Sequence, residues 1–388
     1  MPKRLAIITT HPIQYNAPLF AMLQSRGMIE IKVFYTWGEE VLQDKYDPGF
    51  DKAIQWDIPL LEKYEYTFVK NIAGVKGSHH FNGIDNPTLI AEIDSWKPNA
   101  VLVYGWSFKS HLKVLRYFHG KIPVLFRGDS ILVRKGPILK KKVRQLFLKW
   151  VYGNVDVALY VGTLNKAYYC ENGLLEKQLV FVPHAIDNNR FRKTVDENKD
   201  AISQWKKTIG IDMETVVFLY AGKLDENKNV GMIADAFLQL PKRNRHLVIA
   251  GNGPTEKALK KQYEQHPYIH FLPFQNQTKM PLLYGIADVF VLASHSETWG
   301  LALNEAMACG KAILASSACG AATDIVQTGI NGWVFSANDK ADLSEKMEWF
   351  GTDKSRLIEI GRRSSDIIIN WSYEKGSQTI EDVLLNKR

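Results

Sequence analysis

Short apolar runs alternate with longer segments of helical periodicity along the whole chain. Several runs are almost continuously apolar, which indicates parallel strands that are covered on both faces. The alternation occurs twice and predicts an α/β fold with a doubly wound sheet in each half. The predicted strands are Leu5–Ile8, Ile31–Tyr35, Ala100–Tyr104, Val124–Phe126, Ala158–Val161, Leu179–Val182, Val216–Ala221, Leu247–Ala250, Ile269–Leu272, Val289–Leu292 and Ala312–Ala315.

The length of 388 residues favours two domains over one. Polar residues interrupt the apolar pattern between Asp187 and Lys207, and a fresh strand begins at Val216. We therefore predict an N-terminal domain at residues 1–190, a C-terminal domain at 191–370 and a final helix at 371–388. Ligands of open α/β sheets lie beyond the carboxyl ends of the strands, so the cleft between the domains is the expected site.

The net charge of +8 is unevenly spread. Residues 1–195 hold 27 Lys and Arg against 17 Asp and Glu, and residues 196–388 hold 22 against 24. This asymmetry suggests that the first half meets an anionic partner, although solvated surface charge explains it equally well. Three isolated cysteines disfavour disulfides and a zinc site, and they fit a cytoplasmic chain. No apolar run reaches the roughly 18 residues of a membrane span.

The segment from Val291 to Gly310 reads as strand, loop and helix. The N–H groups at a helix N-terminus bind anions, and Gly300 allows a ligand to approach the backbone closely. Glu297 in the loop and Glu305 in the second helical turn would be repelled by a diphosphate, but they can accept hydrogen bonds from sugar hydroxyls on either side of it. The pattern therefore points to a nucleotide sugar; an ordinary capped helix with surface glutamates is the alternative.

Several motifs occur in a fixed order over residues 183–372. They are Ala221-Gly222-Lys223-Leu224 with Lys228, Ala250-Gly251-Asn252-Gly253-Pro254, Asp288 to Ser294, Glu297 and Glu305 separated by seven residues, Gly320 to Val326, and Gly329 to Phe335. Together they resemble the retaining glycosyltransferases of family 4. The resemblance implies a GT-B fold, in which two Rossmann-like domains face each other across a cleft and a C-terminal helix crosses back to the N-terminal domain. It also implies a UDP- or GDP-linked sugar donor and no cofactor.

The resemblance implies a role for each matching position. Glu297 would bind the donor sugar, Glu305 the ribose, and Lys223 and Lys228 the diphosphate. The other donor-binding positions are Gly222, Gly251 and Gly253, Phe274 and Gln275 near the base, and Thr298, Trp299, Gly300 and Leu301 near the diphosphate. Lys223 stands where the family usually has Arg, so a bidentate fork is lost. No Asp-x-Asp occurs, so a metal has no obvious ligands and the cations must stabilise the leaving group.

The N-terminal half is expected to bind a glycan or lipid-linked acceptor. The stretch from Thr9 to Tyr15 resembles an opening found in family members of surface-polysaccharide pathways, and His11 would hydrogen-bond a ligand there. A structural histidine that caps a turn is the alternative. At Gly128 many relatives carry a histidine, so that catalytic role does not transfer, and Arg127 and Asp129 are the remaining candidates. His184 reads as structural.

Residues 134–150 combine basic side chains with apolar positions at helical spacing. Such a helix could lie on the anionic inner face of a membrane, and a domain helix with a solvated basic edge is the alternative. The stretch lacks the interleaved aromatic residues expected for nucleic-acid binding. Because Gly128 and Lys223 depart from the family pattern, an inactive nucleotide-sugar sensor or scaffold stays open as an alternative. Another GT-B enzyme, such as an epimerase, is a further alternative, although the ordered C-terminal motifs argue against it.

Overall fold

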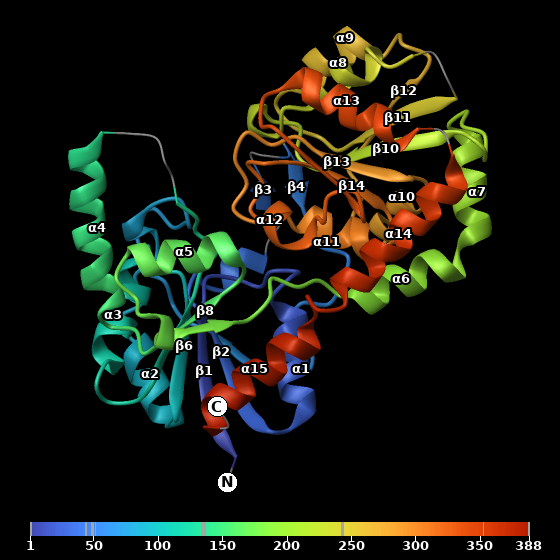
Figure 1. The fold of residues 1–388 in the computed structure, drawn as a ribbon. Helices are drawn as coiled ribbons and strands as arrows, with labels where there is room; N and C mark the ends of the chain where they lie inside the picture. The colour runs from blue at the N-terminus through green and yellow to red at the C-terminus, as the bar shows by residue number, and fades with distance from the viewer. Residues whose placement is uncertain are drawn as a thin grey trace. The chain divides into compact units, whose positions relative to one another are not determined.

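The computed structural model describes residues 2–42, 45–47, 50, 52–132, 137–241, 244–351 and 353–386. The chain forms two compact units (Figure 1). The first comprises Met1–Asp44, Pro59–His184 and Tyr373–Arg388, and the second comprises Lys45–Ile58 and Ala185–Ser372. Residues 45–58 thus group with the second unit, although they lie inside the predicted domain 1–190.

The first unit contains a parallel sheet of seven strands in the order β5-β2-β1-β6-β7-β8-β9. The strands are β1 Lys3–Thr9, β2 Ile29–Tyr35, β5 Glu65–Phe68, β6 Ala100–Tyr104, β7 Val124–Arg127, β8 Val157–Tyr160 and β9 Leu179–Phe181. β1, β6 and β7 are almost wholly buried. Their apolar composition is what covering on both faces requires, and all six strands predicted for this half are confirmed. The order reverses between β1 and β6.

Helices cover both faces of this sheet. They are α1 Ala17–Arg26, α2 Leu89–Trp96, α3 Lys109–Phe118, α4 Ile138–Tyr152, α5 Thr163–Glu171 and α15 Tyr373–Leu385, with short 3₁₀ turns at Glu39–Leu42, Phe81–Gly83 and Glu176–Gln178. The C-terminal helix α15 belongs to this unit, as the GT-B resemblance implies. Arg26 at the end of α1 donates two hydrogen bonds to the buried Glu381, each 2.9 Å, and so fastens α15 to α1.

The second unit contains a parallel sheet of six strands in the order β12-β11-β10-β13-β14-β15. The strands are β10 Val216–Ala221, β11 Arg245–Ala250, β12 Ile269–Leu272, β13 Val289–Leu292, β14 Ala312–Ser316 and β15 Gly332–Phe335. The five strands predicted for this half are confirmed, and β15 was not predicted. A separate antiparallel pair, β3 Lys45–Asp47 and β4 Lys52–Ile54, completes the unit.

Polar residues begin several helices of the second unit. Asp187, Asp339 and Asp353 each accept a hydrogen bond from the backbone N–H three residues later, as N-caps do. The helices are α6 Asn188–Glu197, α7 Lys199–Thr208, α8 Val230–Leu238, α9 Glu256–Tyr263, α10 Met280–Gly285, α11 Leu301–Ala308, α12 Ala322–Ile325, α13 Lys340–Phe350 and α14 Lys354–Ile368, with a 3₁₀ turn at Glu226–Lys228. The polar stretch after Asp187, which the sequence suggests is a break, forms the helices α6 and α7. Most of its charged residues lie on the exposed faces of these helices.

None of the helices in the described part of the chain is both long and apolar enough to cross a membrane.

Candidate functional site

The loops after β10 and β11 pack backbone against backbone. The Leu224 N–H donates to the Asn252 carbonyl oxygen at 2.9 Å, and the Gly222 N–H donates to the Ala250 carbonyl oxygen at 3.0 Å. A Cβ on Gly251 would collide with the carbonyl oxygen of Gly222, and one on Gly253 would collide with that of Leu224. The predicted binding glycines at 222, 251 and 253 thus let two strand ends approach closely at the carboxyl edge of the sheet.

The two predicted phosphate-binding lysines lie on the loop that follows β10. Lys223 is held through its backbone, because the buried Tyr220 hydroxyl donates to its carbonyl oxygen at 2.5 Å. Asp225 accepts a hydrogen bond from the Lys228 N–H at 3.0 Å and caps the 3₁₀ turn. Both lysine backbones are therefore fixed at the carboxyl end of β10.

Lys228 and Glu297 form a hydrogen-bonded ion pair between Nζ and Oε2. Their side chains are 19% and 20% exposed, so the pair is partly shielded from water. Ser294 donates to the same carboxylate at 3.4 Å. Because the strand order reverses between β10 and β13, this pair occupies the position where open α/β sheets bind ligands.

The loop that carries Glu297 is held on both sides by its neighbours. The Glu297 N–H donates to the Ala318 carbonyl oxygen at 3.1 Å, and the Gly320 N–H donates to the Glu297 carbonyl oxygen at 3.0 Å. The Trp299 side chain is buried and donates from Nε1 to Asn304 Oδ1 at 3.0 Å. The indole of Trp299 therefore shapes the loop, while Thr298 precedes it at the exposed rim.

Gly300 begins α11 in a left-handed conformation with φ of 99°. A Cβ there would lie 2.7 Å from Cys319 Sγ, so no other residue fits without strain. Burial raises the pKa of the Cys319 thiol to about 12, and the protonated thiol donates to the Trp299 carbonyl oxygen at 2.9 Å. Leu301 is the first helical residue, so the amides at the N-terminus of α11 begin directly after the Glu297 loop.

Glu305 is buried at 2% exposure within α11. Its Oε2 accepts a hydrogen bond from the Tyr284 hydroxyl at 2.8 Å. Tyr284 is fully buried on α10 and was not predicted, since an aromatic residue in an apolar helix looks like an ordinary core residue. A buried carboxylate held by a tyrosine is fixed in direction.

Phe274 and Gln275 follow β12 at the same edge of the sheet. The Phe274 N–H donates to Asn252 Oδ1 at 2.8 Å, which ties this loop to the glycine-rich turn after β11. Gln275 donates from Nε2 to the Pro273 carbonyl oxygen at 2.9 Å. The predicted donor-binding positions thus follow four adjacent strands, β12, β11, β10 and β13.

In the first unit, His11 follows the carboxyl end of β1. Its Nδ1 lies 2.8 Å from the Thr10 hydroxyl, and its ring meets that of Trp37 edge-on at 5.3 Å. These contacts orient the ring and leave it half-buried. The geometry is compatible both with ligand binding and with a structural role.

Arg127 ends β7 and Asp129 follows it, and only Asp129 stays a candidate for ligand contact. Arg127 is buried and donates to the carbonyl oxygens of Val182 and Pro183 at 2.9 and 3.0 Å, so it ties β7 to the end of β9. Asp129 is half-buried and close enough to His184 to favour its protonation. Burial and Arg127 outweigh that effect and lower the pKa of His184 to about 4, so the imidazole is neutral at pH 7.

His111 on α3 was not predicted and lies where the first sheet reverses its strand order. Its Nδ1 lies 3.0 Å from the carbonyl oxygens of Tyr104 and Gly105, and its Nε2 lies 2.8 Å from the Thr36 hydroxyl. Since carbonyls only accept, Nδ1 carries the proton and Nε2 accepts from Thr36. Complete burial lowers the pKa of His111 to about 4, so it is a neutral structural residue.

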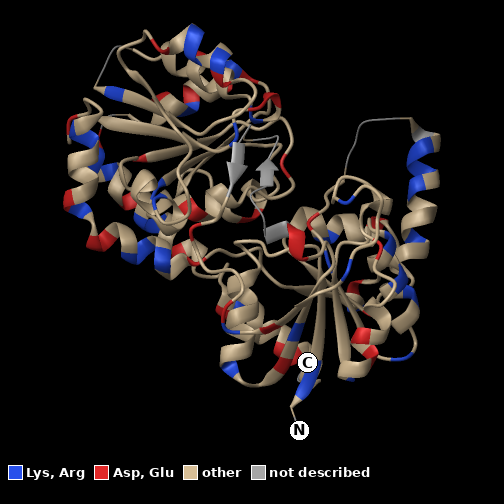
Figure 2. Cartoon of the chain, turned by 180° about the vertical axis from the view of Figure 1, so that it is seen from behind, with Lys and Arg blue, Asp and Glu red and all other residues tan. Residues whose placement is uncertain are grey.

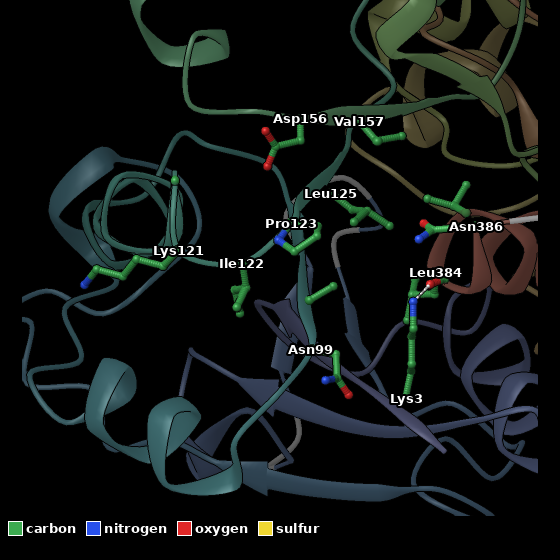
Figure 3. A pocket seen from close by; sticks show the side chains of 13 residues that line it. Lys3, Asn99, Lys121, Ile122, Pro123, Leu125, Asp156, Val157, Leu384 and Asn386 are labelled. Atoms are coloured by element: carbon green, nitrogen blue, oxygen red, sulfur yellow. Dashed lines mark hydrogen bonds between the residues drawn. The ribbon is translucent and has the colours of Figure 1, made fainter. Parts of the chain in front are cut away.

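A cavity of 630 Å³ lies at the opposite end of the first sheet (Figure 3). The residues around it precede or begin strands, or belong to α15 and the turn after it: Lys3, Asn99, Lys121, Pro123, Asp156, Leu384 and Asn386 are among them. Lys3 Nζ donates to the Leu384 carbonyl oxygen at 2.6 Å across it. The cavity therefore lies at the amino ends of the strands and includes neither His11 nor Asp129.

The basic helix predicted at residues 134–150 corresponds to α4, Ile138–Tyr152; Arg134 and Lys135 lie outside the described residues. Its apolar side chains at 139, 143, 146 and 150 are 73%, 61%, 69% and 48% exposed.

Within the described residues, no cluster of three or more His, Cys, Asp or Glu side chains is arranged to hold a metal ion.

Residues 201–364 match the family of glycosyl transferases group 1. This match lies within residues 183–372, over which the order of motifs predicts a glycosyltransferase. The α-monoglucosyldiacylglycerol synthase of Acholeplasma laidlawii is 28% identical over 172 residues, 42% of each chain. The D-inositol 3-phosphate glycosyltransferase of Xylanimonas cellulosilytica is 26% identical over 189 residues, 47% of this chain and 44% of that one. The chain thus matches less than half the length of either relative.

Solved structures share the fold over the full length. HepE of Anabaena, solved with UDP and glucose, is 15% identical with a TM-score of 0.70, and the match covers 99% of this chain and all of that one. Sucrose-phosphate synthase of Thermosynechococcus elongatus is 15% identical with a TM-score of 0.73, and the match covers 99% of each chain. At such low sequence identity these structures establish the fold alone. Their match over the full chain confirms the predicted GT-B fold.

Proposed function

We propose that this chain is a retaining glycosyltransferase that moves a sugar from a nucleotide diphosphate to an acceptor hydroxyl. The observation that carries the proposal is the Lys228–Glu297 ion pair at the reversal of strand order, directly before the N-terminus of α11. A cation and helix amides suit a diphosphate, and a carboxylate suits the hydroxyls of its sugar. The UDP complex of the structurally similar HepE supports UDP as the first choice of nucleotide, with GDP as the second.

In this proposal each donor-site residue has a separate task. Lys223 and Lys228 neutralise the diphosphate, and the amides from Thr298 to Leu301 donate to it. Glu297 orients the sugar, and the carboxylate of Glu305, held by Tyr284, accepts from the ribose hydroxyls. Phe274 and Gln275 follow β12, an edge strand of the second sheet, and flank the base.

The chemistry follows from the charge that develops on the leaving group. The bond from the anomeric carbon to the diphosphate oxygen breaks, and the acceptor oxygen bonds to that carbon from the same face. The acceptor proton passes to the departing phosphate oxygen. Fixed cations and amides beside that oxygen lower the barrier, and losing one such group typically slows a reaction by about 100-fold or more. No protein nucleophile and no metal are invoked.

The acceptor is assigned to the first unit, with His11 and Asp129 as the residues that contact its hydroxyl. Both follow carboxyl ends of parallel strands, where ligands of such sheets bind. The relative from Acholeplasma laidlawii is named for a glucosyl diacylglycerol. This supports a lipid-linked acceptor as an alternative to a glycan.

Helix α4 supports contact between this chain and an anionic membrane surface. It carries five Lys and Arg residues and no Asp or Glu (Figure 2), and its exposed apolar side chains follow one another at helical spacing. Basic helices with an exposed apolar face bind anionic interfaces. The same placement fits a protein on the cytoplasmic face of a membrane that holds a lipid-linked acceptor.

The proposal is tested by thermal-shift screening against a panel of nucleotide sugars, followed by calorimetry and a donor-hydrolysis assay with the best binder. A glycosyltransferase binds the donor and slowly transfers its sugar to water or to an acceptor. Tight binding without any turnover would instead identify a nucleotide-sugar sensor. The absence of binding to every nucleotide sugar would refute both functions.

A further inference from the structure

Residues 45–58, here called the hairpin segment, come from the first half of the sequence but belong to the second unit. β3 and β4 pair antiparallel within it. The segment is fastened to the loop after β12 by its last residues. Asp57 accepts from both the backbone N–H and the hydroxyl of Thr278, and Asn276 Nδ2 donates to the Gln55 carbonyl oxygen at 2.7 Å.

Phe50 lies between β3 and β4 and contacts two residues of the donor site. Its ring centroid is 5.0 Å from that of Phe274, with the planes at 71°. The Lys223 ammonium lies 4.9 Å from the centroid of the same ring, a cation–π distance. One aromatic side chain thus connects a residue assigned to the base with a residue assigned to the diphosphate.

This connection constrains the course of a bound nucleotide. The Phe50 ring contacts both Phe274 and Lys223. A ligand with its base beside Phe274 and its diphosphate at Lys223 therefore passes along the Phe50 ring, which its nucleoside contacts. Aromatic side chains bind bases through their π-faces whatever the base. The half-buried ring packs edge-on against Phe274, and the bonds from Thr278 to Asp57 fix the end of the hairpin segment.

We propose that Phe50 is a nucleoside-binding residue of the donor site, and that the hairpin segment positions it through the Asp57–Thr278 hydrogen bonds. The inference rests on the proposed function, because it deepens the description of the same site. It assigns the segment to nucleotide selection: ligands that carry a nucleoside gain from Phe50, and a bare diphosphate does not.

Calorimetry with UDP, GDP and pyrophosphate tests the inference on the full chain. Phe50→Leu removes the ring but keeps an apolar side chain, and it should weaken binding of the preferred nucleotide by about tenfold, whereas Phe50→Trp should stay within about twofold. Asp57→Ala should weaken nucleotide binding in the same direction. The double variant should bind no more weakly than Phe50→Leu alone, because both changes act through one ring.

Three outcomes would overturn the inference: unchanged nucleotide affinity in Phe50→Leu, an equal loss for pyrophosphate, or fully additive losses in the double variant. Thermal unfolding of every variant is measured alongside, and a loss of stability in Phe50→Leu leaves Phe50→Trp and Asp57→Ala as the decisive variants. Glu305→Gln separates the two proposals. If that variant loses nucleotide affinity while the Phe50 variants do not, the donor site stands and the role of Phe50 falls; if the wild-type chain binds no nucleotide, both fall.

Discussion

Lys228 and Glu297, 69 residues apart in the sequence, form an ion pair that joins the loop after β10 to the loop before α11. The pair places opposite charges side by side where a diphosphate is proposed to bind. Without a ligand, Glu297 neutralises Lys228; with a diphosphate bound, the phosphate oxygens compete with Glu297 for the same ammonium. Substitution of Lys228 should therefore weaken the binding of UDP, whereas substitution of Glu297 should strengthen it.

Lys228→Met removes the charge but keeps the length of the side chain. We expect sugar transfer to slow by about 100-fold or more, because the leaving group loses a fixed cation. UDP should also bind more weakly. Steady-state rates with the donor found by screening check this, and Lys340→Met, which removes a half-exposed lysine paired with Asp235, is the matched control. Wild-type turnover in Lys228→Met would refute the assignment.

Glu297→Gln removes the carboxylate that competes for Lys228. Because a partly exposed ion pair is worth up to about 1 kcal/mol, UDP alone should bind up to about fivefold more tightly to this variant. The intact nucleotide sugar should lose its advantage over UDP, since an amide accepts hydroxyl hydrogen bonds less strongly than a carboxylate. Calorimetry with both ligands measures the difference. Weaker UDP binding would mean that Glu297 does not oppose the phosphate.

Tyr284→Phe deletes the hydroxyl that donates to Glu305 at 2.8 Å and keeps the packing of the ring. The unfolding free energy should fall by about 1–3 kcal/mol, because a buried carboxylate loses a donor. Donor KM should rise about tenfold with a smaller change in kcat, since Glu305 is proposed to hold the ribose in ground and transition states alike. Tyr263→Phe, which deletes a hydroxyl bonded to Asp235 at 2.6 Å on the α8–α9 side of the sheet, should leave KM unchanged.

His111 should make the first unit sensitive to acid. Its pKa is lowered from 6.5 to about 4, so below pH 6.5 the unfolded chain binds a proton that the folded chain does not. The stabilising contribution is complete above pH 6.5 and is lost as the pH falls toward 4, by up to about 1.4 kcal/mol per pH unit.

Denaturant unfolding at pH values between 4 and 7 measures this slope. His111→Asn should be less stable at pH 7 and should show a shallower slope, because one titrating group is gone. His79→Asn, at an exposed position, is the control for the loss of a histidine. His184 and His246, whose pKa values are also lowered to about 4, account for part of the remaining slope. An unchanged slope in His111→Asn would contradict the neutral, buried assignment.

The sequence predicts the two sheets well because parallel strands covered on both faces are continuous apolar runs, as in Val216–Ala221. It does not predict β5 and β15, which are edge strands, or β3 and β4, which form a short hairpin apart from both sheets. The site glutamates emerge from the order of motifs. Their partners do not: Tyr284 looks like a core residue, and Phe50 lies in a segment whose unit is decided by tertiary contacts alone.

Helix α4 should bind anionic vesicles. Leu139, Val143 and Leu146 are each more than 60% exposed, and the charged residues of α4 itself are all basic. Vesicles that contain phosphatidylglycerol should retain the wild-type chain at low salt, and binding should weaken as the Debye length falls from about 30 Å at 0.01 M to about 8 Å at 0.15 M salt. Neutral phosphatidylcholine vesicles should retain much less.

Replacing Leu139, Val143 and Leu146 by serine should abolish vesicle binding while leaving thermal stability within about 1 kcal/mol of wild type, because surface changes away from packed contacts cost little. Reversing the charges at Lys140 and Lys141 should weaken binding and remove much of its salt dependence. A chain that fails to bind anionic vesicles even at low salt would refute membrane contact. So would a serine variant that converts a dimer to a monomer in sedimentation, because the exposed face would then pack against a second copy instead of lipid.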